Sequence, residues 1–187
     1  MIEKLNIPTL LTLLRIALIP IIMVFFYLPW EYSNIATTFI FFIASFTDWL
    51  DGYLARKMQL ETKLGAFLDP VADKIMVACV LVLLVESESS LWMTIAAAII
   101  IGREIIISSL REWMAELGQR ATVKVSSMGK WKTSAQMLAI ACLLYRDTIA
   151  GVSMQQFGLA MLYIAVILTL WSMISYLKSA YSSLKTE

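Results

Sequence analysis

The sequence predicts an all-α integral membrane protein with six transmembrane helices and with both chain ends in the cytoplasm. Three observations lead to this prediction. Of the 187 residues, 60% are hydrophobic and only 16% are charged, and the mean hydropathy of +0.78 exceeds what a soluble domain shows. The hydrophobic residues form runs of about 20, long enough for a helix that crosses a bilayer. The Lys and Arg residues, finally, gather at one end of these runs.

Six hydrophobic runs are candidate spans, and short polar clusters separate them. In chain order they are residues 8–28, 34–56, 66–85, 91–110, 131–149 and 154–177. Pro29 follows the first span, a Glu- and Ser-rich stretch at 86–90 follows the third, and 146–153 forms a short turn before the last. The basic, amphipathic segment 102–133 is predicted to extend the fourth helix into the cytoplasm before the chain loops back. We expect a single domain over residues 1–187.

The charge distribution fixes the expected orientation and excludes some functions. With the N-terminus in the cytoplasm, all of the 15 Lys and Arg residues except Arg146 fall on the cytoplasmic side. The net charge of +1 gives no electrostatic reason to expect nucleic acid as a partner. Histidine is absent, and Cys79 and Cys142 lie apart within apolar runs, so the usual ligands of zinc are missing. Any metal chemistry must therefore depend on carboxylates.

Four aspartates lie where the second span ends and the third begins. Asp48 and Asp51 are three residues apart and Asp69 and Asp73 are four apart, so each pair lies on one helix face. A short connection makes the two helices antiparallel neighbours, and we expect the pairs to converge near the membrane surface. Oxygen ligands alone favour a hard divalent ion, and four carboxylates are enough for two Mg²⁺ or Mn²⁺ ions. Two such ions are typical of phosphoryl transfer.

An alternative is a cation transporter that uses the four aspartates as its ion path. A transporter site is expected near the middle of the membrane, whereas these aspartates lie beside basic residues at one face. Gly52 follows the second aspartate, and Gly65 opens the next helix, at positions where a side chain would obstruct a ligand that approaches the backbone. A helix–helix contact is the alternative role of either glycine alone. Arg56 could reach a phosphate bound there, or its side chain could extend to the membrane interface. These neighbours favour an enzyme over a transporter.

Residues 48–73 carry the pattern D-x-x-D-G-x-x-A-R, eight residues, G, three residues, D, three residues, D, and the chain therefore resembles the CDP-alcohol phosphotransferase family. The fixed positions are Asp48, Asp51, Gly52, Ala55, Arg56, Gly65, Asp69 and Asp73. The resemblance implies a six-helix membrane enzyme, usually a homodimer, that transfers a phosphatidyl or similar group from a CDP-linked donor to an alcohol and releases CMP. It also implies that the four aspartates hold two metal ions, that Asp73 is the base for the acceptor hydroxyl, and that Gly52, Arg56 and Gly65 contact the cytidine diphosphate.

Three further segments resemble the bacterial members of this family that use glycerol 3-phosphate as acceptor. They read NIPTLLTLLRI at 6–16, GREIIISSLREWMAELG at 102–118 and GKWKTSAQM at 129–137. The implied reaction is attack of the sn-1 hydroxyl of glycerol 3-phosphate on the β-phosphorus of CDP-diacylglycerol, which gives phosphatidylglycerol phosphate and CMP at the cytoplasmic face of the inner membrane.

Basic residues on the side of the aspartates are the candidates for binding an acceptor phosphate. They are Arg103, Arg111, Lys124, Lys130 and Lys132, and Arg111, Lys130 and Lys132 are the first candidates. Cytoplasmic Lys and Arg also set membrane topology and bind anionic lipid headgroups, so each of these residues has an alternative role. The aspartates do not select the acceptor, and serine or inositol phosphate remains an alternative to glycerol 3-phosphate.

Overall fold

The computed structural model of this chain describes residues 6–58, 62–117 and 127–184. Its helices are α1 (Ile7–Tyr27), α2 (Ser33–Met58), α3 (Lys63–Glu88), α4 (Leu91–Glu116), α5 (Ser127–Tyr145) and α6 (Met154–Leu184). Two short antiparallel strands, β1 (Thr148–Ile149) and β2 (Val152–Ser153), form a hairpin between α5 and α6. The all-helical prediction and its six helices are confirmed for the described part of the chain.

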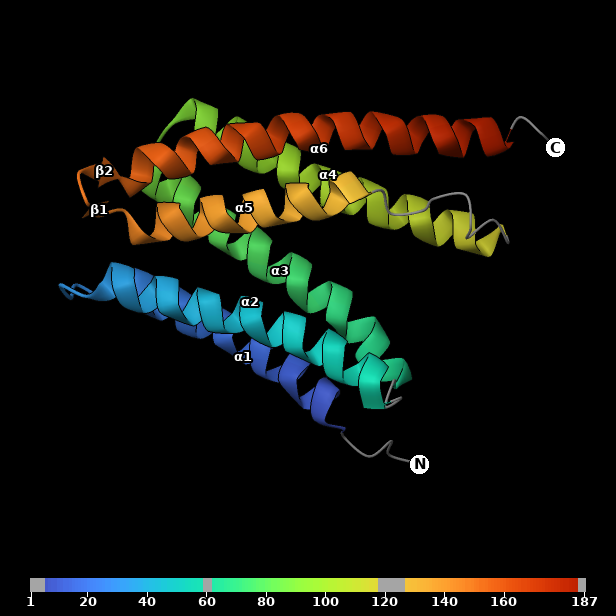
Figure 1. The fold of residues 1–187 in the computed structure, drawn as a ribbon, viewed down its shortest axis with the longest axis horizontal. Helices are drawn as coiled ribbons and strands as arrows, with labels where there is room; N and C mark the ends of the chain where they lie inside the picture. Colours follow the sequence, from blue (N-terminus) through green and yellow to red (C-terminus); the bar gives the residue numbers. More distant parts are fainter. Residues whose placement is uncertain (1–5, 59–61, 118–126, 185–187) are drawn as a thin grey trace.

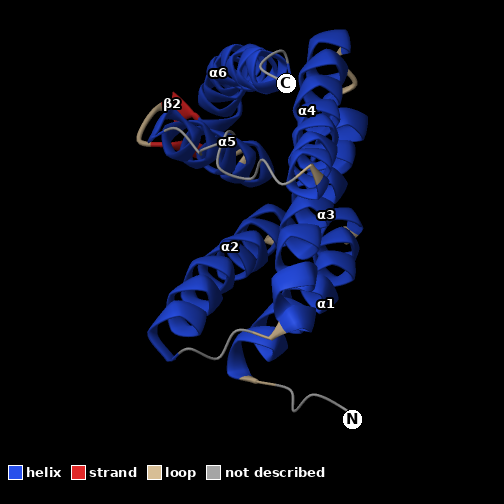
Figure 2. Cartoon of the chain, turned by 90° about the vertical axis from the view of Figure 1, so that its right-hand side faces the viewer, coloured by secondary structure: helices blue, strands red, loops and turns tan. Residues whose placement is uncertain are grey.

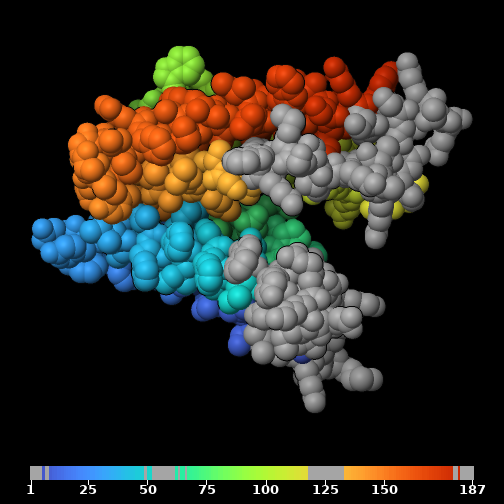
Figure 3. Space-filling model, viewed as in Figure 1, coloured from blue at the N-terminus to red at the C-terminus, as the bar shows by residue number. Residues whose placement is uncertain are grey.

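Three of the helices contain a stretch that is long and apolar enough to cross a membrane. These stretches are Thr9–Tyr27 in α1, Leu91–Glu116 in α4 and Met154–Lys178 in α6. Large apolar side chains on the outside of the bundle, including those of Phe39 and Trp171, are exposed. The surface that α2, α5 and α6 form is visible in Figure 3. This combination of long apolar helices and outward-facing apolar side chains is that of a membrane protein.

The helices pack as two neighbouring pairs joined by α3. Figure 1 shows α1 beside α2 and α5 beside α6, and α3 runs between these pairs in contact with α1, α4 and α5. The core lies where α3, α4 and α5 meet, and Leu84, Ile100 and Leu143 are fully buried there. Gly158 allows α6 to approach α5 closely, because a Cβ atom at this position would lie 2.8 Å from Leu143 Cγ.

One end of the bundle collects the features that the sequence singled out. The start of α1, the end of α2, the start of α3 and the end of α6 all lie at this end (Figure 1). Figure 2 looks onto the same end and shows α1 and α2 on one side and α5 and α6 on the other. Thr62 caps α3, since its Oγ1 accepts a hydrogen bond from the backbone N–H of Gly65 at 2.9 Å. This cap fixes where α3 begins and hence the depth of its aspartates.

The fifth helix differs from the predicted span 131–149. It starts earlier, at Ser127, and ends at Tyr145. The helix ends there because Arg146 adopts a left-handed backbone conformation with φ of 62°. Ala150 and Gly151 also have positive φ and make the hairpin turn. The fourth helix extends to Glu116, past the predicted span end at 110, as the basic amphipathic segment indicated. Its predicted return loop lies mostly outside the described residues.

Candidate active site

Three of the four aspartates converge. Asp48 and Asp51 come from the last turns of α2 and Asp69 from the second turn of α3, and each offers a carboxylate oxygen within 4.8 Å of the others. The two helices run in opposite directions from a short connection, so the three-residue spacing on α2 faces the start of α3. Asp51 is almost fully buried, whereas Asp48 and Asp69 are partly exposed. The predicted convergence of the aspartate pairs is thus observed for these three.

Arg15 on α1 closes this cluster, and the sequence interpretation missed it. Its Nη1 lies 2.7 Å from Asp48 Oδ1 and 3.4 Å from Asp69 Oδ1, and its Nη2 lies 2.5 Å from Asp51 Oδ2. The side chain has 0% exposure. The sequence assigned Arg15 to the basic residues that set topology. The signal that identifies it is its position inside an apolar span, where a charge marks a functional site.

Two threonines on α1 extend the polar face that Arg15 begins. Thr9 and Thr12 are buried and precede Arg15 at three-residue intervals, so all three lie on one face of the helix. The Thr12 hydroxyl donates to Asp51 Oδ2 at 3.5 Å, and the Thr9 and Thr62 hydroxyl oxygens lie 3.0 Å apart. A Cβ atom on Gly65 would lie within 3.0 Å of both of these hydroxyls. Gly65 therefore lets α1 and α3 approach each other closely.

Asp73 lies one turn beyond Asp69 on α3 and faces a different space. Its Oδ1 is buried and has no hydrogen-bond partner among the described residues. The charges of Asp48, Asp69 and Arg15 act on it, and so does that of Glu104 on α4. Asp73 therefore lies between the aspartate cluster and the part of the molecule that α4 forms.

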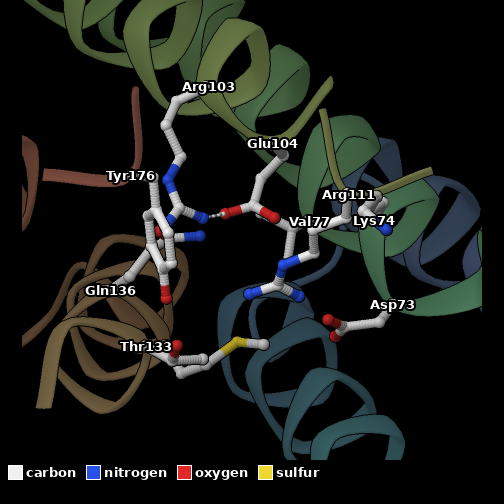
Figure 4. A pocket seen from close by; sticks show the side chains of 10 residues that line it. Asp73, Lys74, Val77, Arg103, Glu104, Arg111, Thr133, Gln136 and Tyr176 are labelled. Carbon is white, nitrogen blue, oxygen red and sulfur yellow. Dashed lines mark hydrogen bonds and ion pairs between the residues drawn. The ribbon is translucent and has the colours of Figure 1, made fainter. Parts of the chain in front are cut away.

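A cavity of about 240 Å³ opens beside Asp73. Four helices line it, as Figure 4 shows from close by. Residues on α3, α4, α5 and α6 contribute, among them Asp73, Lys74, Arg103, Glu104, Arg111, Gln136 and Tyr176. Arg103 and Arg111 were predicted from the sequence to bind an acceptor phosphate, and the fold brings both to this cavity. Glu104, Gln136 and Tyr176 were not predicted, because neither charge nor spacing distinguishes them from structural residues.

Four predicted site residues are described only by their backbone. Gly52 and Arg56 lie in α2, and Lys130 and Lys132 lie in the first turns of α5, but the side chains of Arg56, Lys130 and Lys132 lie outside the described part. Lys124 lies outside the described residues altogether. Thr133, the next residue after Lys132, lines the cavity.

The aspartate cluster fits a hard divalent cation. Its donors are carboxylate oxygens, the ligand type that Mg²⁺ and Mn²⁺ prefer. Three carboxylates surround a single guanidinium, so negative charge remains in excess. The buried Asp73 Oδ1, which has no partner in the described residues, adds a fourth carboxylate one turn away. Both the chemistry and the charge of this donor set are therefore compatible with a bound metal.

Comparison with known proteins places the chain in a family. The CDP-alcohol phosphatidyltransferase family matches residues 5–171. A Haemophilus influenzae protein named CDP-diacylglycerol–glycerol-3-phosphate 3-phosphatidyltransferase is 59% identical over 181 residues, which cover 97% of this chain and 96% of that protein. Proteins of the same name from Salmonella choleraesuis and Shigella flexneri are 54% identical over 179 residues, or 96% of this chain and 97% of theirs. The chain therefore belongs to the CDP-alcohol phosphatidyltransferase family.

Proposed function

We propose that this protein transfers the phosphatidyl group of CDP-diacylglycerol to the sn-1 hydroxyl of glycerol 3-phosphate, giving phosphatidylglycerol phosphate and CMP. Relatives that match nearly the whole chain at 54–59% identity carry the name of this enzyme. The structural observation that carries the proposal is the placement of Asp69 and Asp73 one turn apart on α3. Asp69 belongs to the aspartate cluster and Asp73 faces the cavity, so α3 joins a site for the donor to a site for the acceptor.

Asp48, Asp51, Asp69 and Asp73 would hold two divalent ions, Mg²⁺ or Mn²⁺. Such ions, when bound, neutralise phosphate oxygens and stabilise the charge that develops during phosphoryl transfer. Gly52, Arg56 and Gly65, which lie near the same ends of α2 and α3, would contact the cytidine diphosphate of the donor.

Asp73 would act as the base. In the transfer step the sn-1 oxygen forms a bond to the β-phosphorus, while the bond between this phosphorus and the bridging oxygen breaks. CMP leaves with the bridging oxygen, and Asp73 accepts the proton of the attacking hydroxyl. Asp73 Oδ1 is buried and has no hydrogen-bond partner among the described residues, so this oxygen is available to accept that proton.

The cavity suits a small acceptor that carries a phosphate. Its volume of about 240 Å³ lies below the roughly 300–1,000 Å³ of pockets for drug-sized ligands, so a three-carbon acceptor fits better than a second lipid. Arg103 and Arg111 supply planar guanidinium groups suited to phosphate oxygens. Lys130 and Lys132, one turn before cavity-lining residues on α5, would add positive charge. This charge argues against serine as the acceptor.

The six helices would form a single domain over residues 1–187 that spans the bacterial inner membrane, with both chain ends and the active site facing the cytoplasm. The aspartate cluster, the start of α1 and the end of α6 lie at one end of the bundle, which supports this orientation. The two acyl chains of the donor would lie among the membrane lipids beside the helices, while glycerol 3-phosphate and CMP exchange with the cytosol. A homodimer would be its working form, as the family resemblance implies.

A radiolabel assay tests the function. Purified protein in detergent and lipid is given CDP-diacylglycerol, Mg²⁺ and one labelled acceptor, which is glycerol 3-phosphate, serine or inositol phosphate. We expect turnover with glycerol 3-phosphate alone, its loss when EDTA is added, and its return with Mg²⁺ or Mn²⁺. Turnover with another acceptor only would retain the aspartate chemistry but overturn the acceptor assignment. No turnover with any acceptor would overturn the enzyme and favour an ion path through the aspartates.

A further inference from the structure

The ring of Tyr176 on α6 lies close to the guanidinium groups of both arginines of the cavity. The Cζ atom of Arg103 lies 5.9 Å from the centre of its ring, and the Cζ atom of Arg111 lies 5.7 Å from the same point. Figure 4 shows the ring beside the Arg103 guanidinium, with the Arg111 side chain entering the cavity from the same helix as Arg103. The side chain of Tyr176 is only 7% exposed, so the surrounding helices hold the ring in place. A cation within about 6 Å of an aromatic ring is attracted to its face.

A second residue of α6 acts on Arg103 as well. This residue is Ser172, whose Oγ accepts a hydrogen bond from Arg103 Nη2 at 3.3 Å. Arg103 Nη1 donates to Glu104 Oε1 at 2.8 Å. Ser172 and Tyr176 are four residues apart, so both project from one face of α6 toward α4. The Arg103 Nε atom is buried without a hydrogen-bond partner in the described residues. The orientation of the Arg103 guanidinium is therefore set by residues of α4 and α6, while its Nε–H remains available to a ligand.

The charges around the cavity leave positive charge at the arginines. Glu104 offsets the charge of Arg103, and Lys74 Nζ turns back to donate to the Pro70 carbonyl at 3.2 Å. Among the described residues no carboxylate forms an ion pair with Arg111, whose recorded partner is the Tyr176 ring. Two neighbouring guanidinium groups repel each other, and the ring offsets part of this repulsion without neutralising either charge. The pair can then bind a dianionic phosphate.

We propose that Tyr176 is a positioning residue of the acceptor site, whose ring contacts the Arg103 and Arg111 guanidinium groups and orients both toward the phosphate of the acceptor. The proposal rests on the proposed function, since it assigns the cavity to a phosphate-bearing acceptor. It predicts that Tyr176 contributes to acceptor affinity without touching the phosphatidyl donor. The ring, and not the hydroxyl group, is the part that acts.

Steady-state kinetics on three variants test the proposal. Tyr176→Leu, which removes the ring, is expected to raise the KM for glycerol 3-phosphate about tenfold and to leave the KM for CDP-diacylglycerol within about twofold of wild type. Tyr176→Phe keeps the ring and is expected to retain a KM near that of wild type. Tyr163→Leu removes an exposed tyrosine from the same helix away from the cavity and serves as the matched control.

The possible results separate this proposal from the proposed function. If wild-type protein does not use glycerol 3-phosphate, the proposed function fails, whatever the variants do. If wild type is active but Tyr176→Leu leaves the acceptor KM unchanged, or raises both KM values equally, the positioning role is overturned. Equal defects in Tyr176→Leu and Tyr176→Phe would also overturn it. Should Tyr176→Leu fail to fold, Ser172→Ala is the second variant; a rise of about threefold in the acceptor KM alone supports the arrangement, and an unchanged KM overturns it.

Discussion

Arg15 and Asp51 form a buried ion pair, in which the Arg15 Nη2 lies 2.5 Å from Asp51 Oδ2 and the two side chains are 0% and 3% exposed. The arginine comes from α1 and the aspartate from α2, and the same guanidinium also contacts Asp69 on α3. A charge that is removed from water is costly unless it is paired. The cluster therefore contributes to the packing of three helices as well as to the site.

Replacement of Arg15 by Gln is expected to destabilise the metal-free protein. Removing one partner of a buried ion pair costs about 3–5 kcal/mol, because the other charge stays buried alone. Mn²⁺ or Mg²⁺ is expected to recover part of this loss by supplying the missing positive charge. Thermal unfolding in detergent, followed by circular dichroism with EDTA and then with Mn²⁺, measures both effects. Arg15→Lys, which keeps the charge without the planar fork, should lie between Gln and wild type. Equal losses with and without metal would show that Arg15 only packs.

Replacement of Asp69 by Asn is expected to reduce turnover at least about 100-fold while the fold is retained. The amide preserves the shape of the side chain but removes a negative charge from the donor set, and even outer partners of metal ligands cost up to about 100-fold when lost. Turnover and Mn²⁺ affinity are measured together with the unfolding temperature. Asp147→Asn, at the hairpin end of the molecule, is the control and should keep full activity. Retained activity in Asp69→Asn would contradict the metal assignment.

Replacement of Arg111 by Ala, and separately of Lys132 by Ala, is expected to raise the KM for glycerol 3-phosphate far more than the KM for the lipid donor. A hydrogen bond to a charged group contributes about 1.5–3 kcal/mol, which corresponds to a tenfold or greater loss of affinity. Initial rates with one substrate varied at a time give both constants. A variant in which the two KM values rise equally would place that residue outside the acceptor site.

Membrane orientation can be measured with cysteine labelling. In a background where Cys79 and Cys142 are replaced by Ala, single cysteines are placed at Ala150 in the hairpin and at Glu116 at the end of α4. A membrane-impermeant maleimide is expected to label position 150 in intact spheroplasts and position 116 only after the membrane is opened. The opposite pattern would reverse the proposed orientation, and labelling of both positions from outside would contradict the even number of spans.

The six helices were predictable because long apolar runs separated by polar clusters favour helices, and most of the observed helix ends lie within a few residues of the predicted span ends. The end of α5 could not be predicted from the sequence, because the helix ends where the backbone of Arg146 becomes left-handed. The hairpin that follows turns through Ala150 and Gly151, whereas the sequence signals for such turns are Asn-Gly and Asp-Gly. Backbone conformations set by tertiary contacts leave little trace in local sequence.

The candidate site likewise contains residues that the sequence predicted and residues that it did not. The spacing of Asp48, Asp51 and Asp69 predicted their convergence, because a helical period and a short connection fix which faces meet. Tyr176 could not be predicted, since it reaches the arginines from a helix about 65 residues further along the chain. Arg15 was missed, although the sequence carried a signal for it: a charge in the first apolar span needs a partner, and the aspartates supply it.

The division of the two sites between helix pairs has a consequence for how the protein becomes active during synthesis. The aspartate cluster is complete once α3 has joined α1 and α2, whereas the cavity also requires α6, which leaves the ribosome after these three helices. Neighbouring helices such as α1 and α2 can pair as soon as they enter the membrane, since their contacts are local in sequence. On the proposed function, a partly inserted chain would be able to hold a donor and yet have no acceptor site, so catalysis begins only when α6 has packed against α4.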